Sequence, residues 1–141
     1  MTVDFALYAA DDVQTTVVAW LAPLRRTGFE RTAGDPLPSC VVEVVAGTES
    51  VGQSFSDPVV SVHTFCDKAL GAVAARDECA KTHNRMLLLI DEHEITIGDR
   101  VVGVDYLEVV ESPRWEYYSD NILRKVARYR LGLPYVPNLD Q

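Results

Sequence analysis

The sequence predicts an α+β fold in which two helices pack on one mostly antiparallel sheet, with the elements in the order α-ββ-α-ββ-β. Two segments carry apolar residues at intervals of three and four, the spacing of one helix face. β-branched runs separated by glycine-containing segments are typical of hairpins. A length of 141 residues suits one domain, so we expect a single domain over residues 1–141.

The first helix is expected over residues 11–26. Two aspartates at its start complement the helix dipole, and Gly28, which follows two arginines, predicts its end. Pro23 predicts a kinked or frayed last turn. The residues of its apolar face are Val13, Val17, Trp20, Leu21 and Leu24.

The first hairpin is expected from strands at residues 39–46 and 59–66, after a polar linker that ends in Pro36 and Pro38. The segment between these strands, residues 47–57, is about ten residues long, whereas a hairpin turn needs about two to five. The extra length predicts a contact with another protein. The residues assigned to this contact loop are Gly47, Thr48, Glu49, Val51, Gln53 and Phe55.

The second helix is expected over residues 67–90, with an apolar stripe near the helical period and an end that is apolar on all sides, which predicts burial. The stripe consists of Ala69, Ala72, Val73, Cys79, Ala80, His83, Met86, Leu87 and Ile90. A second hairpin is expected from strands at residues 94–97 and 100–110 around the turn at Gly98 and Asp99. The second of these strands is apolar on both faces, which predicts a central position in a sheet.

The last strand is expected over residues 123–135, after Pro113 ends the preceding strand and residues 114–120 form an aromatic crossover. Pro134 and Pro137 are expected to close it. Alternation places two sets of side chains on opposite faces of this strand. One set is Leu123, Ala127, Tyr129, Leu131 and Leu133, and the other is Arg124, Arg128 and Arg130.

Composition excludes several classes of partner. With 13 basic and 21 acidic side chains, the chain carries a net charge of −8 and has a pI of about 4.7, which argues against nucleic acid over the whole surface and against an anionic membrane. The longest apolar stretch, residues 17–24, is far shorter than the ~20 residues of a bilayer span, and no secretory signal is predicted. Three widely spaced cysteines, Cys40, Cys66 and Cys79, predict reduced thiols in a cytoplasm-like compartment.

One pattern has the ligand types of a structural zinc site: His63 and Cys66, followed by Cys79 and His83. Residues three apart on a strand leave opposite faces, which counts against His63 and Cys66 as joint ligands. Cys79 and His83 share a helical face, but it is the apolar one, where a buried thiol and a core histidine are commoner. We therefore predict no metal site, although stoichiometric zinc in the purified protein would revive the idea.

A second pattern, Asp91, Glu92 and Glu94, offers carboxylates for acid–base chemistry. Acids in an exposed connection between helix and strand are far more often solvated. The sequence contains no nucleophile elbow, no phosphate-binding glycine loop and no dinucleotide-binding fingerprint. It therefore predicts a protein that is not an enzyme and takes no cofactor.

Charge is unevenly distributed along the chain. Residues 114–130 hold five basic and two acidic side chains, a net charge of +3, which leaves −11 for the remainder. A positive stripe on an acidic body can orient copies of a chain towards one another, although a merely solvated basic strand face has equal weight. Trp115 and Tyr117, beside the stripe, are residue types enriched at interface hot spots.

A series of features in order along the chain is shared with a known family. It comprises Leu37-Pro38 before a valine strand, Gly47 at the start of the hairpin loop, Asp57-Pro58-Val-Val-Ser-Val, an alanine-rich helix ending His83-Asn-Arg85-Met86, Val104-Asp105, Glu111-Ser-Pro113-Arg-Trp115, and Asp120 with Arg124-x3-Arg128-Tyr129. Over about residues 36–136, the series resembles the tail terminator proteins of long-tailed phages with non-contractile tails, especially those that infect mycobacteria and related actinobacteria.

The resemblance implies a structural virion protein, assembled in the host cytoplasm, that forms a homohexameric ring on the head-proximal end of the tail tube. Such a ring stops tube polymerisation and contacts both the tail tube protein and a head-completion or stopper protein. DNA passes through its channel without sequence-specific binding. The resemblance implies no catalytic residue, no cofactor and no membrane.

On this basis we expect Arg124, Arg128 and Arg130 to pair with acids of a neighbouring subunit, with Trp115 and Tyr117 packed at the same contact. The loop at residues 47–57 is expected to touch the tail tube or a neck protein, and surplus acids to line the channel. The alternatives are another neck component, such as a head–tail connector or stopper, a small zinc-binding or acid–base protein, and a dimeric α+β binding protein of non-viral origin.

Overall fold

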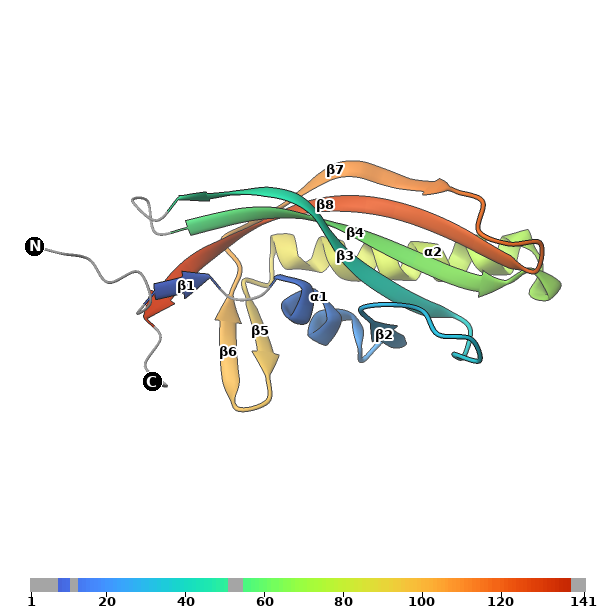
Figure 1. Ribbon diagram of the computed structural model, residues 1–141, viewed down its shortest axis with the longest axis horizontal. Coiled ribbons are helices and arrows are strands. Elements are labelled where there is room, and N and C mark those ends of the chain that lie inside the picture. Colours follow the sequence, from blue (N-terminus) through green and yellow to red (C-terminus); the bar gives the residue numbers. More distant parts are fainter. Residues whose placement is uncertain (1–7, 11–12, 51–54, 138–141) are drawn as a thin grey trace, which may run out of the picture.

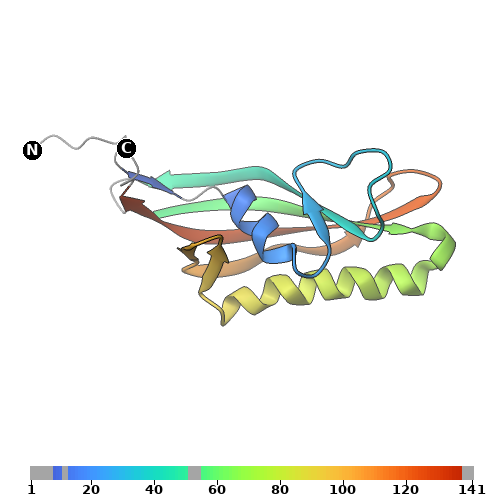
Figure 2. The same cartoon turned by 90° about the horizontal axis from the view of Figure 1, so that it is seen from below.

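The computed structural model describes residues 8–10, 13–50 and 55–137 (Figure 1). One long, twisted sheet has both helices on the same face, and a small separate hairpin lies beside them (Figures 1 and 2). In chain order the elements are β1 (Tyr8–Ala10), α1 (Val13–Leu21), β2 (Arg26–Gly28), β3 (Ser39–Ser50), β4 (Phe55–Asp67), the 3₁₀ helix η3 (Lys68–Leu70), α2 (Ala72–Leu87), the 3₁₀ helix η4 (Leu88–Ile90), β5 (Glu94–Ile97), β6 (Arg100–Gly103), β7 (Tyr106–Trp115) and β8 (Ile122–Pro137). The predicted α+β class is confirmed.

The main sheet has the order β2-β3-β4-β8, and the far edge of β8 pairs with β7 and, near its end, with β1. These pairs are antiparallel except for β2 with β3. Within the described residues, β5 and β6 pair only with each other. β7 is an edge strand whose register shifts twice and which contains Pro113. Such irregularities keep a sheet edge from pairing with other chains.

The core lies between the sheet and the two helices. Along β8, every second side chain from Ala127 to Leu133 is buried, as the alternation in the sequence predicts. Full burial of one large apolar side chain stabilises the fold by roughly 1.5–3 kcal/mol. The members of the main core cluster are Val13, Val17, Leu21, Val42, Val60, Val62, Met86, Leu89, Ile95, Val104, Leu107, Ala127, Tyr129, Leu131 and Leu133. In the described part of the chain, no helix is long and apolar enough to cross a membrane.

The first helix is shorter than predicted, because α1 ends at Leu21 rather than at residue 26. Pro23 cannot donate a helical hydrogen bond and disfavours a helical residue before it, so the chain leaves the helix there. Leu24, which was assigned to the apolar face, is exposed. Arg26 begins β2, a three-residue parallel strand too short for periodicity to reveal.

The contact loop predicted at residues 47–57 is mostly strand. β3 continues to Ser50 and β4 begins at Phe55, with Gly47 opposite Pro58 in the ladder. The long antiparallel partner supplies hydrogen bonds on both sides of the glycine, so Gly47 does not end the strand. Of the assigned residues, Gly47, Thr48, Glu49 and Phe55 lie in the paired strands, while Val51 and Gln53 lie outside the described residues.

The second helix is divided by Gly71, whose φ of 96° separates η3 from α2. Only one face of α2 contacts the sheet, and its buried residues are Ala75, Cys79, Thr82 and Met86. Most of the predicted stripe is therefore wrong, because Ala69, Ala72, Val73, Ala80 and Ile90 are exposed. The apolar end is not buried on all sides either: Leu89 enters the core, whereas Leu88 and Ile90 are half exposed.

The strand predicted at residues 100–110 is two strands in two sheets, since β6 ends at Gly103 and β7 begins at Tyr106. Between them, the Val104 N–H donates to the carbonyl of His93 and the Asp105 N–H donates to the carbonyl of Gly132, each at 2.7 Å. These two hydrogen bonds hold in place the segment that connects the small hairpin to the main sheet. Residues 100–110 are thus apolar on both faces because they belong to two strands in different environments, and not because one strand lies at the centre of a sheet.

Two of the three prolines that were expected to end strands, Pro113 and Pro134, lie inside them, whereas Pro137 is the last residue of its strand. Pro113 sits within β7, where the ladder to β8 is irregular and an edge strand needs no donor. Pro134 and Pro137 belong to β8, which runs to Pro137. Arg114 and Trp115 are consequently part of β7, and the crossover to β8 covers only residues 116–121.

Candidate assembly interface

One face of the main sheet points away from both helices, and we call it the outer face (Figure 2). Direct partners in the ladders share a face, so the register assigns residues from four strands to it. They are Glu43 of β3, Ser61, His63 and Phe65 of β4, Arg124, Arg128 and Arg130 of β8, and Tyr106, Glu108 and Glu111 of β7. The three arginines therefore lie together, opposite the core, as the alternation predicts.

Each of these arginines has a carboxylate partner within the same chain. The nitrogen–oxygen distances are 3.2 Å for Arg124–Glu116, 3.8 Å for Arg128–Glu111 and 3.4 Å for Arg130–Glu108. The positive stripe found along the sequence is thus offset by acids of β7 and of the crossover that follows it. Exposed pairs of this kind contribute up to about 1 kcal/mol each, so they can be exchanged for pairs with another chain.

Two of these guanidinium groups retain unused donors. The Nε atoms of Arg124 and Arg128 are buried, and neither has a hydrogen-bond partner in the described part of the chain. Leaving such a donor unpaired costs about 1–3 kcal/mol. These two donors are a local energetic cost of the arginine row, and because both atoms are buried they are not themselves open to another chain.

His63 lies in the middle of the outer face. Its Nε2 is 3.0 Å from the Ser61 hydroxyl and 3.6 Å from a carboxylate oxygen of Glu43. Burial lowers the pKa of His63, an effect that the Glu43 carboxylate partly opposes. The histidine is therefore held mainly in its neutral form.

The aromatic residues near residue 115 lie on both sides of the sheet. Tyr118 packs edge-on against Phe65 on the outer face, with ring centroids 4.8 Å apart. Trp115 pairs instead with Lys125, whose Nζ is 4.7 Å from the centre of the indole ring, on the face that carries the helices. The predicted contact residues therefore do not all share one face of the sheet: Trp115 lies on the helix side and the three arginines lie on the outer face.

A cavity of about 250 Å³ lies at the end of the sheet where β7 turns into β8. We call it the end pocket, and its lining includes Trp115, Tyr117, Leu123, Arg124 and Lys68. Trp115 and Tyr117 both line it, whereas their expected place at a subunit contact stays a prediction. Sequence reasoning missed Lys68, because the pocket depends on η3 lying against the crossover, where the Lys68 N–H donates to the carbonyl of Asn121.

The four residues of the zinc-like pattern do not converge. His63 is on the outer face, whereas His83 belongs to α2, on the other side of the sheet, with its Nδ1 2.6 Å from the hydroxyl of Tyr129. Cys66 of β4 and Cys79 of α2 are buried together between the sheet and the helix. Among the described residues, no group of three or more metal-ligating side chains could hold an ion.

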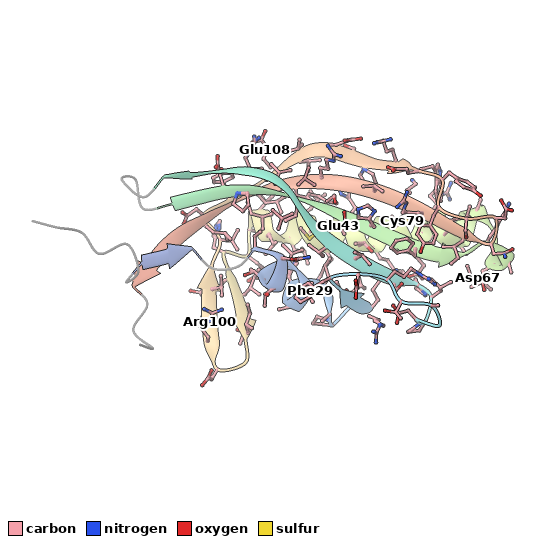
Figure 3. The ribbon with its side chains drawn as sticks, viewed as in Figure 1. Phe29, Glu43, Asp67, Cys79, Arg100 and Glu108 are labelled. Atoms are coloured by element: carbon pink, nitrogen blue, oxygen red, sulfur yellow. The ribbon has the colours of Figure 1, made fainter. Side chains whose placement is uncertain are left out.

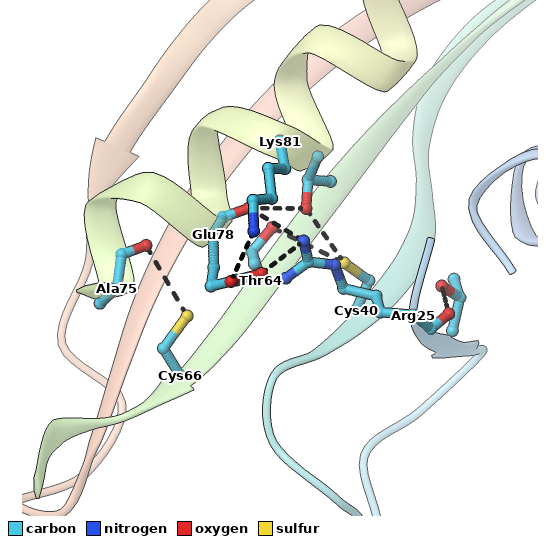
Figure 4. Close-up of polar contacts among 9 residues, drawn as sticks. Arg25, Cys40, Thr64, Cys66, Ala75, Glu78 and Lys81 are labelled. Atoms are coloured by element: carbon cyan, nitrogen blue, oxygen red, sulfur yellow. Dashed lines mark hydrogen bonds and ion pairs between the residues drawn. The ribbon is translucent and has the colours of Figure 1, made fainter. Parts of the chain in front are cut away.

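A buried polar cluster lies beneath α2 (Figure 4). The Arg25 guanidinium binds the Glu78 carboxylate at 3.0 Å and also donates to its carbonyl. The Lys81 ammonium, and then Arg25, hold the pKa of Glu78 below its usual range. Burial raises the pKa of the nearby Cys40 thiol, which contacts Thr64 and Thr82. This cluster ties β2 to α2, and the sequence pattern gave no sign of it.

No protein-family model matches the chain, and no curated protein matches it. Among solved structures, the chain is similar to one from the virion of a native gene transfer agent (GTA) particle, with a TM-score of 0.55 and 10% sequence identity. The similarity covers 84% of this chain and 84% of that one. At this level of identity, the similarity establishes a shared fold.

Proposed function

We propose that this protein is a structural virion component, namely a tail terminator subunit that forms a hexameric ring on the head-proximal end of a phage tail tube. The observation that carries the proposal is the fold, shared over most of both chains with a protein of a gene transfer agent virion. The ordered series of features at about residues 36–136 supports the finer assignment. The ring would join the tail tube protein to a head-completion or stopper protein.

The surfaces described above suit a ring. A head-to-tail ring needs two different complementary patches on each subunit. The outer face supplies one candidate, because Arg128 and Arg130 hold their carboxylate partners at the surface, in partly exposed ion pairs. The end pocket, with Trp115 and Tyr117, supplies another.

The end of the β3–β4 hairpin is the proposed contact with the tube or neck. Because its strands are paired as far as Ser50 and Phe55, the contact would be made by a long ribbon rather than by a flexible loop. The acidic surplus of the chain, −8 overall, would keep DNA from adhering to the channel wall. Replacing residues 51–54 with Asn-Gly should leave the subunit folded and abolish capping.

A polymerisation assay tests the proposed function. Tail tube protein is assembled with and without the full chain, and tube lengths are measured by electron microscopy. We expect the chain to shorten the tubes in proportion to its concentration. Tubes of unchanged length would contradict the proposal, and rings that bind a head vertex but no tube would indicate a connector or stopper instead.

A further inference from the structure

The end pocket has the size of a site for side chains. Its volume of about 250 Å³ is below the roughly 300–1,000 Å³ of pockets that bind drug-sized molecules. Apart from Trp115, Tyr117 and Tyr118, its apolar lining comes from Ile122 and Leu123 at the start of β8. It therefore suits one or two apolar side chains of another protein segment.

Exposed aromatic side chains line this pocket. Tyr117 is 74% exposed, Trp115 is 46% exposed and Tyr118 is 39% exposed. Single exposed apolar residues are ordinary, but a group of them around a cavity marks a protein contact. The end of the sheet is therefore a candidate docking surface.

The charges at the pocket favour an acidic occupant. Its own acids are engaged: Glu116 pairs with Arg124 at 3.2 Å, and Asp120 accepts a hydrogen bond from the hydroxyl of Tyr117 at 2.9 Å. Lys68, by contrast, has no carboxylate partner among the described residues. An occupant with a carboxylate beside an apolar side chain would complement both features.

The β5–β6 hairpin offers this combination. Ile95 and Val102 anchor its base in the core, while its tip stands away from the sheet (Figures 1 and 3). The register places Glu94, Thr96 and Val101 on its outward face. Val101 is 57% exposed, and the carboxylates of Glu94 and Asp99 have no ion pair within the described part of the chain.

The hairpin and the end pocket lie far apart on one subunit. Figure 3 shows Arg100 on the protruding hairpin and Asp67 at the opposite end of the molecule, next to the pocket residue Lys68. A contact between the two surfaces must therefore join two copies of the chain. Because the surfaces differ, the contact is head-to-tail, the type that builds a ring when the rotation from one copy to the next closes.

We propose that the end pocket of one copy receives the β5–β6 hairpin of the next copy, with Val101 in the pocket and Glu94 or Asp99 facing Lys68. The proposal rests on the proposed ring, for which it names the contact between neighbouring subunits. It does not require the arginine row of the outer face to lie in that contact.

Cysteine cross-linking tests this contact. All three native cysteines are buried, so Tyr117→Cys and Val101→Cys would each be the accessible thiol of its variant. The two variants are mixed on tail tubes and oxidised with diamide. We expect disulfide-linked dimers in the mixture and none with either variant alone. In the control, Tyr117→Cys is mixed with Lys81→Cys in place of Val101→Cys. Lys81 is a 59% exposed residue of α2, and this mixture should give no dimers.

A charge exchange provides the second arm. Lys68→Glu in the Tyr117→Cys variant should reduce the cross-link yield several-fold, and Asp99→Lys in the Val101→Cys variant should restore it. Rings seen on tubes without the Tyr117–Val101 cross-link would overturn this inference and leave the proposed function intact. Dimers from Tyr117→Cys alone would overturn it too, since they indicate a symmetric contact. The absence of both rings and cross-links would refute the inference and the proposed function together.

Discussion

The ring of Tyr106 lies over Gly132, its direct partner in the β7–β8 ladder, so closely that a methyl group on Gly132 would overlap the ring. The glycine is required for this approach, and the aromatic side chain covers the backbone that the glycine leaves bare. The Asp105 N–H also donates to the Gly132 carbonyl. This contact fixes the point where the chain enters the main sheet.

Gly132→Ala should therefore destabilise the fold by about 1–3 kcal/mol, the usual cost of overpacking. Urea denaturation measures the loss. Tyr106→Ala removes the overlap, so adding Gly132→Ala to that variant should cost well under 1 kcal/mol more. If Gly132→Ala lowered the free energy of unfolding equally in the natural chain and in the Tyr106→Ala variant, the Tyr106 ring would not be the cause of the loss.

The hydrogen bond between Tyr129 and His83 links β8 to α2. Tyr129→Phe removes the buried hydroxyl and leaves the imidazole Nδ1 without its partner, which should cost about 1–2 kcal/mol. Tyr117→Phe is the matched control, because its hydroxyl bonds to Asp120 at the surface, and it should cost less than about 0.5 kcal/mol. Similar losses in both variants would count against the buried bond.

Stability should fall in mildly acidic solution. Burial lowers the pKa of both His63 and His83 below the ordinary value of 6.5. The unfolded chain therefore binds protons at a higher pH than the folded chain does. The free energy of unfolding should be greatest above pH 6.5 and decrease as the pH falls through that value toward the lowered ones.

Chemical denaturation at about pH 7 and about pH 5.5 measures this effect. The variant with His63→Gln and His83→Gln should show a smaller decrease than the natural chain. Glu78 contributes in a different range, because its pKa lies below the ordinary 4.5 and its contribution is lost only as the pH falls below that value. If the free energy of unfolding decreased by the same amount in the double variant, the histidines would be ruled out as the cause.

Arg128→Glu should weaken the proposed ring if the outer face lies in a subunit contact. The change also places two carboxylates together, because Arg128 faces Glu111 within the chain. The exchange of both residues, Arg128→Glu with Glu111→Arg, restores the internal pair. If the arginine binds a neighbouring subunit, light scattering should show ring formation impaired in both variants, whereas recovery in the exchanged variant would assign it an internal role only.

The sequence predicted the parts of the fold that depend on regular alternation. Tyr129 and Arg128 were assigned to opposite faces of one strand, and the structure confirms this. Elements that depend on tertiary contacts were not predicted. β2 is held by its parallel pairing with β3, and Gly47 stays in a strand because β4 pairs with β3 at that point. Short local signals cannot report such pairing partners.

For the candidate interface, the limitation was similar. A charge count along residues 114–130 treated the arginines as a free positive stripe, yet Glu108 and Glu111 reach them from the adjacent strand. The end pocket depends on η3 approaching the β7–β8 crossover, which no single segment reveals. The sequence identified the residue types of the candidate interface. Their interaction partners could be found only from the arrangement of the strands in the sheet.

Electron microscopy of the full chain mixed with its tail tubes tests the central claim most directly. The account predicts a six-fold ring at one end of each tube, with the opposite end free. Tubes with two bare ends at saturating protein, or density spread along their sides, would contradict it.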